Sequence, residues 1–178
     1  MANLGVPIIK TVNGTGVFAG SNVMWLDRHT YLLGTSNRTN AVGAAQVEEE
    51  LHNLGVSQVL RVAVPYDQAH VDGFISLVDD HKAVISPWLI SLDLRRQLLD
   101  LDLTLIEATN LDEVGRLGTN FVALQPGQVI MPEGFPETRA LLESNGVGVT
   151  PSECDEVLRG GGVVHCMTAF LKRDPTEA

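Results

Sequence analysis

The chain has 178 residues, of which 44% are hydrophobic and 19% are charged, and its formal net charge is −10. This length and composition predict one globular domain with a sizeable core rather than a disordered chain. The acidic balance argues against a nucleic-acid or anionic-membrane partner, because both carry negative charge, and is compatible with a cationic ligand. No apolar run is long enough to span a membrane, and the N-terminus lacks the basic stretch of a signal peptide. Two cysteines, Cys154 and Cys166, are too few for a disulfide framework, so we expect reduced thiols and a cytoplasmic location.

Taken in order, the chain shows three units, each with two short strands, a helix and a third strand. In the first unit (about residues 6–64) the predicted strands are 23–26, 30–33 and 57–64, and the helix runs from an N-cap at Thr39 or Asn40 to Leu54. In the second (about 65–107) the strands are 73–78, 82–85 and 103–107, and the helix is 88–101. In the third (about 118–149) the strands are 120–124, 128–131 and 147–149, and the helix is 135–143. A short helix at 152–158 and a closing strand at 163–171 complete the prediction.

Three repeats of one supersecondary unit favour a propeller-like α/β (α+β) fold, with the chain as a single domain. A doubly wound parallel sheet is the alternative. It fits the pattern less well, because pairs of short strands precede each helix.

A run of three glycines, Gly160 to Gly162, comes before an apolar stretch that carries His165 and Cys166. Glycine lets the backbone adopt positive φ and approach another group closely. A thiol held just past such a turn is a candidate nucleophile. The alternative is a buried cysteine on a core strand, which is the commoner use of this residue.

His70 and Asp72 lie two residues apart, in the segment that connects the first unit to the second. On an extended segment both side chains point to the same side. A histidine can act as general acid or base near neutral pH, and a neighbouring carboxylate can hold a cation or orient the imidazole. The alternative is a polar loop with a surface histidine.

Other patterns give less. Arg38 stands at a predicted helix start, which suits an anion such as a carboxylate, although an ordinary capping segment has the same composition. The glycines of residues 12–22 do not fit a nucleotide-binding fingerprint, and no G-x-S-x-G elbow occurs. His165 and Cys166, even with His70 or Cys154, lack the spacing of zinc ligands. We therefore expect neither a metal nor a cofactor.

Together these motifs resemble the guanidino-group-modifying enzyme superfamily, which includes arginine deiminases, dimethylarginine dimethylaminohydrolases and amidinotransferases. The resemblance rests on three stretches and extends from Val6 to Asp174. They are Gly160-Gly-Gly-Val-Val-His-Cys-Met-Thr168, His70-x-Asp72, and Trp25-Leu-Asp followed by Leu33-Gly-Thr-Ser-Asn-Arg-Thr-Asn40. The superfamily has the pentein fold, a five-bladed propeller of ββαβ modules, so the resemblance implies that about three of five modules are present.

The resemblance also implies roles. Cys166 matches the nucleophile that attacks the central guanidinium carbon and forms a covalent thiouronium intermediate. His70 matches the general acid/base, and Asp72 matches a carboxylate that grips the guanidinium nitrogens. Arg38 matches an arginine that binds the substrate carboxylate in the deiminases. The implied function is a cysteine-dependent hydrolase or transferase acting on a small cationic guanidino compound.

Two departures from the family pattern favour an alternative. Ala19-Gly-Ser-Asn22 stands where the family usually has Glu-Gly-(Gly/Ala)-Asp, so both acids are replaced. Two modules are also missing at the N-terminal side, as in a shortened form. The alternative is therefore an impaired or inactive relative with a binding or assembly role, and a third possibility is a structural domain with a buried cysteine. Because an open propeller exposes strand edges, we also expect a homo-oligomer.

Overall fold

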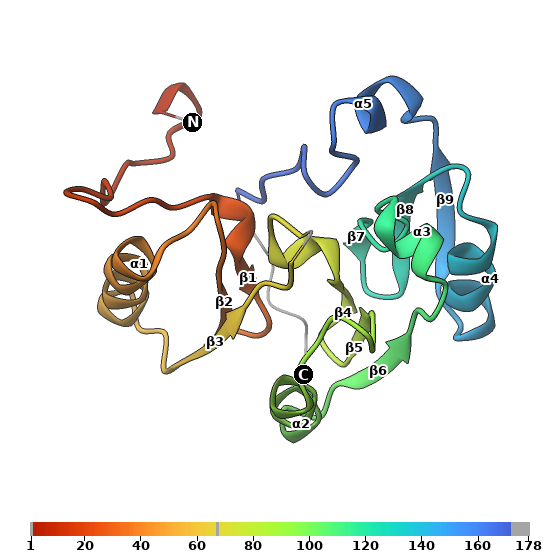
Figure 1. Ribbon diagram of the computed structural model, residues 1–178, viewed down its shortest axis with the longest axis horizontal. Coiled ribbons are helices and arrows are strands. Elements are labelled where there is room, and N and C mark those ends of the chain that lie inside the picture. The colour runs from red at the N-terminus through yellow and green to blue at the C-terminus, as the bar shows by residue number, and fades with distance from the viewer. Residues whose placement is uncertain (1, 67, 172–178) are drawn as a thin grey trace.

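The computed structural model of the chain describes residues 2–66 and 68–171. Three small mixed sheets follow one another along an arc, from the first unit at the left of Figure 1 to the third at the right. In each sheet the first two strands are antiparallel and the second and third are parallel. The predicted ββαβ repeats are therefore present.

The elements have the following bounds. The first unit contains η2 (Gly20–Asn22), β1 (Val23–Trp25), β2 (Thr30–Thr35), α1 (Ala41–Asn53) and β3 (Gln58–Ala63), after a short η1 (Ala2–Leu4). The second contains η3 (Val71–Gly73), β4 (Ile75–Asp79), β5 (Lys82–Ile85), α2 (Leu92–Asp100) and β6 (Thr104–Glu107). The third contains α3 (Leu111–Gly115), β7 (Val122–Gln125), β8 (Gln128–Pro132), α4 (Pro136–Ser144) and β9 (Gly148–Ser152), and α5 (Asp155–Arg159) follows.

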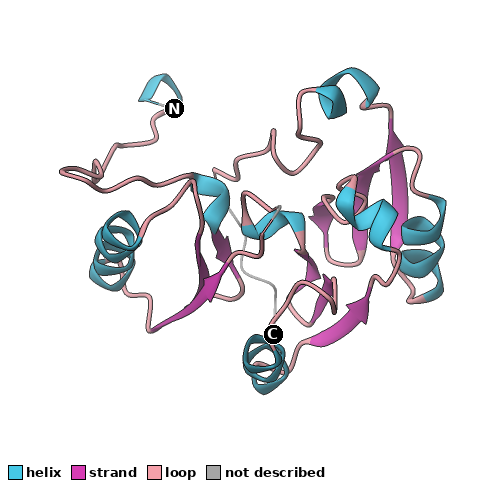
Figure 2. Ribbon diagram, in the orientation of Figure 1, coloured by secondary structure: helices cyan, strands magenta, loops and turns pink. Residues whose placement is uncertain are grey.

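Connection length explains the pattern within each sheet. A short turn can join only antiparallel neighbours, whereas a parallel neighbour requires a crossover, which the helix supplies. In the first unit, Leu32 of the central strand therefore pairs with Met24 on one side and with Leu60 on the other. Figure 2 shows the crossover helices on the outer side of the arc, so the first strand of each unit lies towards its inner side.

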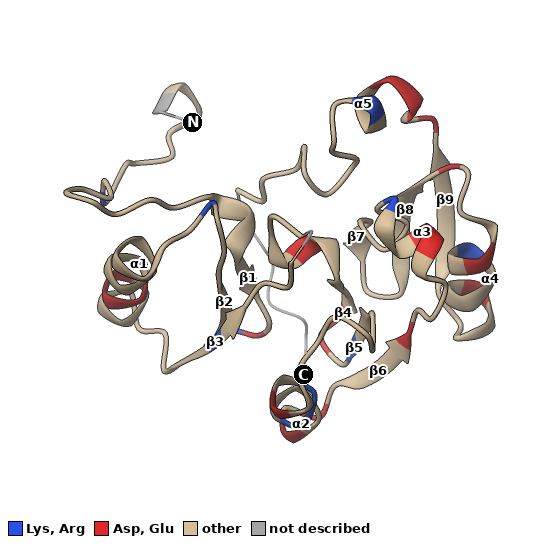
Figure 3. Ribbon diagram, viewed as in Figure 1, with Lys and Arg blue, Asp and Glu red and all other residues tan. Residues whose placement is uncertain are grey.

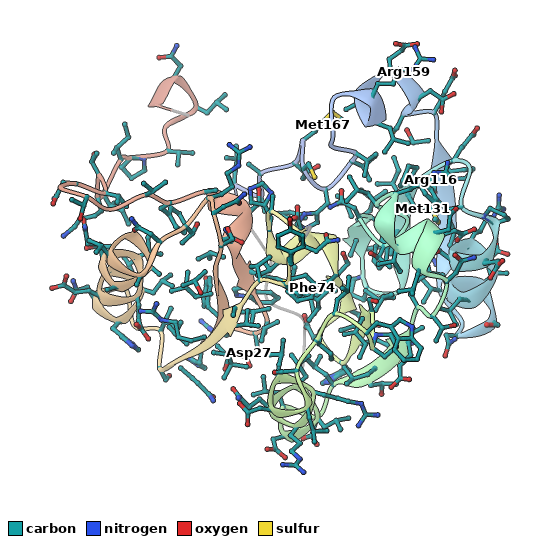
Figure 4. The ribbon with its side chains drawn as sticks, viewed as in Figure 1. Asp27, Phe74, Arg116, Met131, Arg159 and Met167 are labelled. Carbon is teal, nitrogen blue, oxygen red and sulfur yellow. The ribbon has the colours of Figure 1, made fainter. Side chains whose placement is uncertain are left out.

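Two apolar clusters hold the units together. One joins the first unit to the second and includes Leu32, Phe74 and Leu98, and the other joins the second to the third and includes Phe121 and Leu142. All five side chains are fully buried, and Figure 4 labels Phe74 near the centre of the molecule. Each unit is therefore stabilised mainly by its neighbour, as in other repeat architectures.

Side chains cap the starts of helices α1 and α4. Asn40 accepts a hydrogen bond from the Gly43 backbone N–H (2.8 Å) at the start of α1. The first turn of α4 has a remote cap, because the buried Glu113 carboxylate accepts hydrogen bonds from the backbone N–H groups of Glu137 (3.0 Å) and Thr138 (2.7 Å). Both arrangements satisfy donors that a helix N-terminus leaves unpaired.

Charged residues gather on the outer helices α1, α2, α4 and α5, as Figure 3 shows. None of the helices in the described part of the chain combines the length and apolarity that a membrane crossing requires.

The predicted closing strand over 163–171 is wrong. This segment contains a turn in which the Met167 N–H donates to the Val163 carbonyl (3.2 Å), and none of its residues belongs to a strand. Val163 and Val164 are both buried in one cluster with Cys154. Because a strand sends successive side chains to opposite faces, burying two neighbours in one cluster requires the chain to turn.

Three helices also differ from the prediction. Helix α5 begins at Asp155 rather than Ser152, because Ser152 is the last residue of β9. Helix α2 begins at Leu92 rather than Trp88, because the Ser91 hydroxyl accepts from the Leu94 N–H (3.1 Å) and so caps it. The sequence reading missed the five-residue α3, which Asn110 caps. A single turn of helix is too short to show a 3.6-residue apolar period.

Candidate active site

Asp72 occupies the short helix η3, at the inner end of the second unit. His70 precedes this helix in an extended conformation (φ −142°, ψ 161°), and Asp72 itself is only 2% exposed. Close packing against the first unit holds this segment, because a Cβ added to Gly34 of β2 would lie 2.6 Å from a methyl carbon of Val71. The carboxylate is therefore fixed by its backbone surroundings.

Cys166 reaches the same place from the far end of the chain. Gly161 has φ +84°, a left-handed conformation that favours glycine, and it turns the chain from α5 towards the centre of the arc. The Cys166 sulfur lies 3.7 Å from Asp72 Oδ2. The structure therefore brings together two residues that are 94 positions apart in the sequence.

Burial of the thiol raises the pKa of Cys166 above its ordinary value, and the negative charge of Asp72 raises it further. Hydrogen bonds to the Val163 backbone and to Asn120 act in the opposite direction. As a result, the unliganded site favours the neutral thiol over the thiolate that a nucleophile requires.

Asn120 links the carboxylate and the thiol. It is fully buried, and its Nδ2 donates to the backbone carbonyl of Asp72 (3.0 Å). Its Oδ1 accepts hydrogen bonds from the Cys166 backbone N–H (3.4 Å) and from the Cys166 thiol (3.5 Å). One amide therefore fixes the distance between the two groups.

Sequence reasoning missed Asn120, although a signal exists. A buried polar residue stands shortly before the first strand of each unit: Asn22 before β1, Asp72 before β4 and Asn120 before β7. Because buried polar groups require partners, residues at equivalent places in a repeat are expected to meet where the units meet.

His165 also belongs to the cluster. Its Nδ1 lies 3.0 Å from Asp72 Oδ2, and its side chain is 27% exposed against 3% for that of Asp72. It lines a cavity of about 620 Å³ between β1 and the segment after Cys166, together with Trp25 and Tyr31. It also borders a smaller cavity of about 40 Å³.

His70 lies on the same loop as Asp72, as the sequence predicts. Its imidazole forms no hydrogen bond with Asp72 or Cys166 among the residues that the structure describes. The preceding carbonyl, that of Ala69, accepts from Asn22 Nδ2 (3.4 Å). The loop is therefore anchored through its backbone.

Arg38 is exposed in the turn between β2 and α1, where its backbone N–H donates to Ser36 Oγ (3.0 Å). Within the described ranges, no contact joins it to Cys166 or Asp72. The structure therefore does not bring Arg38 to the cluster.

The two positions that depart from the family pattern are structural here. Ala19 donates its backbone N–H to Thr39 Oγ1 (3.0 Å). Asn22 is fully buried, and its Nδ2 lies 3.0 Å from Ser36 Oγ and 2.9 Å from Thr39 Oγ1. An amide at this place thus binds η2 to the turn before α1.

In the described part of the chain, no group of three His, Cys, Asp or Glu side chains is placed so that it could hold a metal ion.

Comparison with known proteins identifies the family. Residues 10–173 match the family described as N,N-dimethylarginine dimethylhydrolase, eukaryotic. The chain belongs to this family. An arginine deiminase of Mycoplasma capricolum subsp. capricolum is 27% identical in a gapped alignment 191 positions long, which covers 89% of this chain and 47% of the deiminase. The chain thus spans about half the length of the curated relatives it matches.

Solved structures agree on the fold of this dimethylarginine dimethylhydrolase-family chain. An inosamine-phosphate amidinotransferase of Streptomyces griseus has a TM-score of 0.77 at 21% identity, with 93% of this chain and 49% of that protein covered. A dimethylarginine dimethylaminohydrolase of Pseudomonas aeruginosa in complex with citrulline has a TM-score of 0.66 at 21% identity, covering 82% of this chain and 52% of that one. The expected membership of the guanidino-modifying superfamily and the partial pentein propeller are both confirmed.

Proposed function

We propose that the chain carries the cysteine-bearing half-site of a guanidino-modifying enzyme, with Cys166 as nucleophile and Asp72 as the group that binds the guanidinium. The observation that carries this proposal is the 3.7 Å between Cys166 Sγ and Asp72 Oδ2. A guanidinium that donates an N–H to this carboxylate has its central carbon beside the sulfur. Such positioning supplies much of the rate enhancement in a reaction between two groups.

Charge explains how the thiol becomes reactive. Asp72 raises the pKa of Cys166 while the site is empty. A bound guanidinium offsets this negative charge, so that the thiol loses its proton when the electrophile is in place. Substrate binding and activation of the nucleophile are then one event.

The reaction has two stages. The thiolate forms a C–S bond to the guanidinium carbon, the C–N bond breaks, and His70 gives a proton to the departing amine, leaving a thiouronium on Cys166. In the second stage His70 takes a proton from water or from an acceptor amine, which attacks the same carbon and releases the thiol. Water yields a ureido product, whereas an amine completes an amidino transfer.

Mass spectrometry with 2-chloroacetamidine, a small cationic alkylating agent, tests the proposal. We expect stoichiometric labelling of Cys166, slowed by Asp72→Asn and by His70→Ala, while the buried Cys154 stays unlabelled. Equal, slow labelling of both cysteines would contradict an active site. Assays for citrulline and ammonia then separate hydrolysis from transfer.

A second candidate, a relative that binds without turnover, is favoured by one observation. Asn22 uses its amide as a structural link, and Ala19 offers no carboxylate to a catalytic histidine or substrate. Losing one oriented electrostatic group often reduces the rate about a hundred- to a thousandfold. Labelling of Cys166 without release of ammonia or amine from any guanidino compound would support this candidate.

The predicted homo-oligomer and the role of Arg38 in binding a substrate carboxylate stay predictions. Light scattering at micromolar concentration checks the first, where a monomer would contradict it. For the second, Arg38→Ala is expected to weaken arginine binding but not agmatine binding, because agmatine lacks the carboxylate.

A further inference from the structure

The carboxylate oxygen nearest the nucleophile already has a partner. Asp72 Oδ2 lies 3.7 Å from Cys166 Sγ and 3.0 Å from His165 Nδ1. Because the Asp72 side chain is only 3% exposed, few directions of approach remain open. The imidazole therefore occupies the oxygen that would place a guanidinium carbon beside the sulfur.

A guanidinium or amidinium binds a carboxylate best through two parallel N–H···O bonds. That geometry uses both oxygens of Asp72, so His165 must release or share Oδ2 when such a ligand binds. A primary ammonium donates from a single nitrogen, so it gains less binding free energy than a guanidinium does when it replaces His165 on the Asp72 carboxylate.

The structure leaves room for the ring to move. His165 is partly exposed and borders the cavity of about 620 Å³ that Trp25 and Tyr31 also line. The backbone around it is a turn outside any strand, in which the Thr168 N–H donates to the His165 carbonyl (3.0 Å). A rotation of the side chain therefore breaks no strand pairing.

We infer that His165 is a resident occupant of Asp72 that competes with the cationic group of the substrate and turns towards the cavity when the ligand binds. This inference rests on the proposed function, since it takes Asp72 as the guanidinium-binding group. His165 thereby acts as a specificity-determining residue. Paired N–H donors displace the imidazole, whereas single cationic donors do not.

NMR titration of the full chain tests the competition, with Cys166→Ala as the background to prevent alkylation or turnover. The probes are methylguanidinium and methylammonium. His165→Ala is expected to bind methylguanidinium about tenfold more tightly than the background, as one charge-assisted hydrogen bond no longer has to be displaced. The preference for methylguanidinium over methylammonium is expected to narrow.

Two matched variants control the result. His165→Asn keeps an N–H donor close to the place of Nδ1, so its affinity is expected to stay near that of the background. His81→Ala removes an exposed histidine of the second unit and is expected to change nothing. Equal or weaker methylguanidinium binding by His165→Ala would overturn the inference, because the histidine would then assist binding.

A second measurement separates this inference from the proposed function. In chain labelled with ¹⁵N-histidine, the Nδ1 resonance of His165 is expected to shift in Asp72→Asn, and an unchanged resonance overturns the inference. If no variant binds methylguanidinium, the proposed function fails, while this resonance still decides whether His165 occupies Asp72.

Discussion

Two boundaries between units place a buried asparagine beside the same loop, but only the asparagine at the second boundary contacts Cys166, the proposed nucleophile. At the first boundary, Asn22 donates to the carbonyl of Ala69. At the second, Asn120 donates to the carbonyl of Asp72 and also contacts Cys166. The loop with His70 and Asp72 is thus held at its backbone from both sides. The comparison shows how a repeat can use a buried asparagine twice, once to hold a loop and once to position the thiol of Cys166, which we propose as the nucleophile.

The largest effect is expected for Asn120→Ala. It removes the donor to the Asp72 carbonyl and the acceptor near Cys166, so no side chain then holds Asp72 and Cys166 at a fixed distance from each other. We expect labelling of Cys166 by 2-chloroacetamidine to slow about a hundredfold, consistent with loss of one oriented polar group. The buried carbonyl left unpaired is also expected to lower the free energy of unfolding by about 1–3 kcal/mol.

Inactivation kinetics and urea unfolding of the same samples measure both quantities. If Asn120→Ala and Asn22→Ala slowed labelling equally, the distinction between the two boundaries would be lost.

The sequence predicted most of this arrangement, for identifiable reasons. The three units follow from hairpin-length turns and helical periods, and Cys166 and Asp72 follow from motifs that match the superfamily. Asn120 was missed because its partners are a backbone carbonyl and a distant thiol, which no local pattern shows; only its place before the first strand of a unit, shared with Asn22 and Asp72, marks it. The strand at 163–171 was wrong because β-branched residues favour strands locally, whereas the buried cluster around Val163 decides the backbone path.

The second effect concerns charge at the second boundary. Asp72 contributes to the raised pKa of Cys166, so Asp72→Asn is expected to lower it. The thiolate fraction at pH 8 then rises, and alkylation by neutral iodoacetamide is expected to be about three- to tenfold faster. The pH profile of this alkylation moves to lower pH.

For the cationic reagent 2-chloroacetamidine, the expected effect of Asp72→Asn on the labelling rate has the opposite sign. This reagent loses its binding group in Asp72→Asn and is expected to label Cys166 more slowly than it labels the unaltered chain. If Asp72→Asn changed the labelling rates of both reagents in the same direction, Asp72 would not be the group that binds the cationic reagent.

The third largest effect is expected for a change at the first boundary, and it is mainly an effect on stability. Asn22→Ala removes the link between η2, the turn before α1 and the Ala69 carbonyl, and is expected to cost about 1–3 kcal/mol of the free energy of unfolding. Because Asn22 does not touch Cys166, labelling by 2-chloroacetamidine is expected to change less than about tenfold. Asn22→Asp sharpens the test, since a carboxylate of similar shape cannot donate to the two hydroxyls as Nδ2 does, and it repels the Ala69 carbonyl. If Asn22→Asp slows labelling more than Asn22→Ala does, displacement of the His70 loop is the cause.

The smallest effect on the site is expected for Glu113, a buried polar link that lies at neither boundary. Its carboxylate caps α4 through Glu137, Thr138 and the Thr138 hydroxyl, which donates to Oε2 (2.6 Å). Glu113→Ala leaves these donors unpaired at a helix N-terminus and is expected to lower the free energy of unfolding by about 1–3 kcal/mol. Glu113→Gln keeps one acceptor oxygen and is expected to lose less. Neither variant should alter labelling of Cys166, because α4 packs on the outer side of the third unit. Slower labelling of Cys166 in Glu113→Gln without a loss of stability would show that a change at the outer helix of the third unit reaches the thiol. A place away from the unit boundaries would then not distinguish buried polar residues that only stabilise the fold from those that position Cys166.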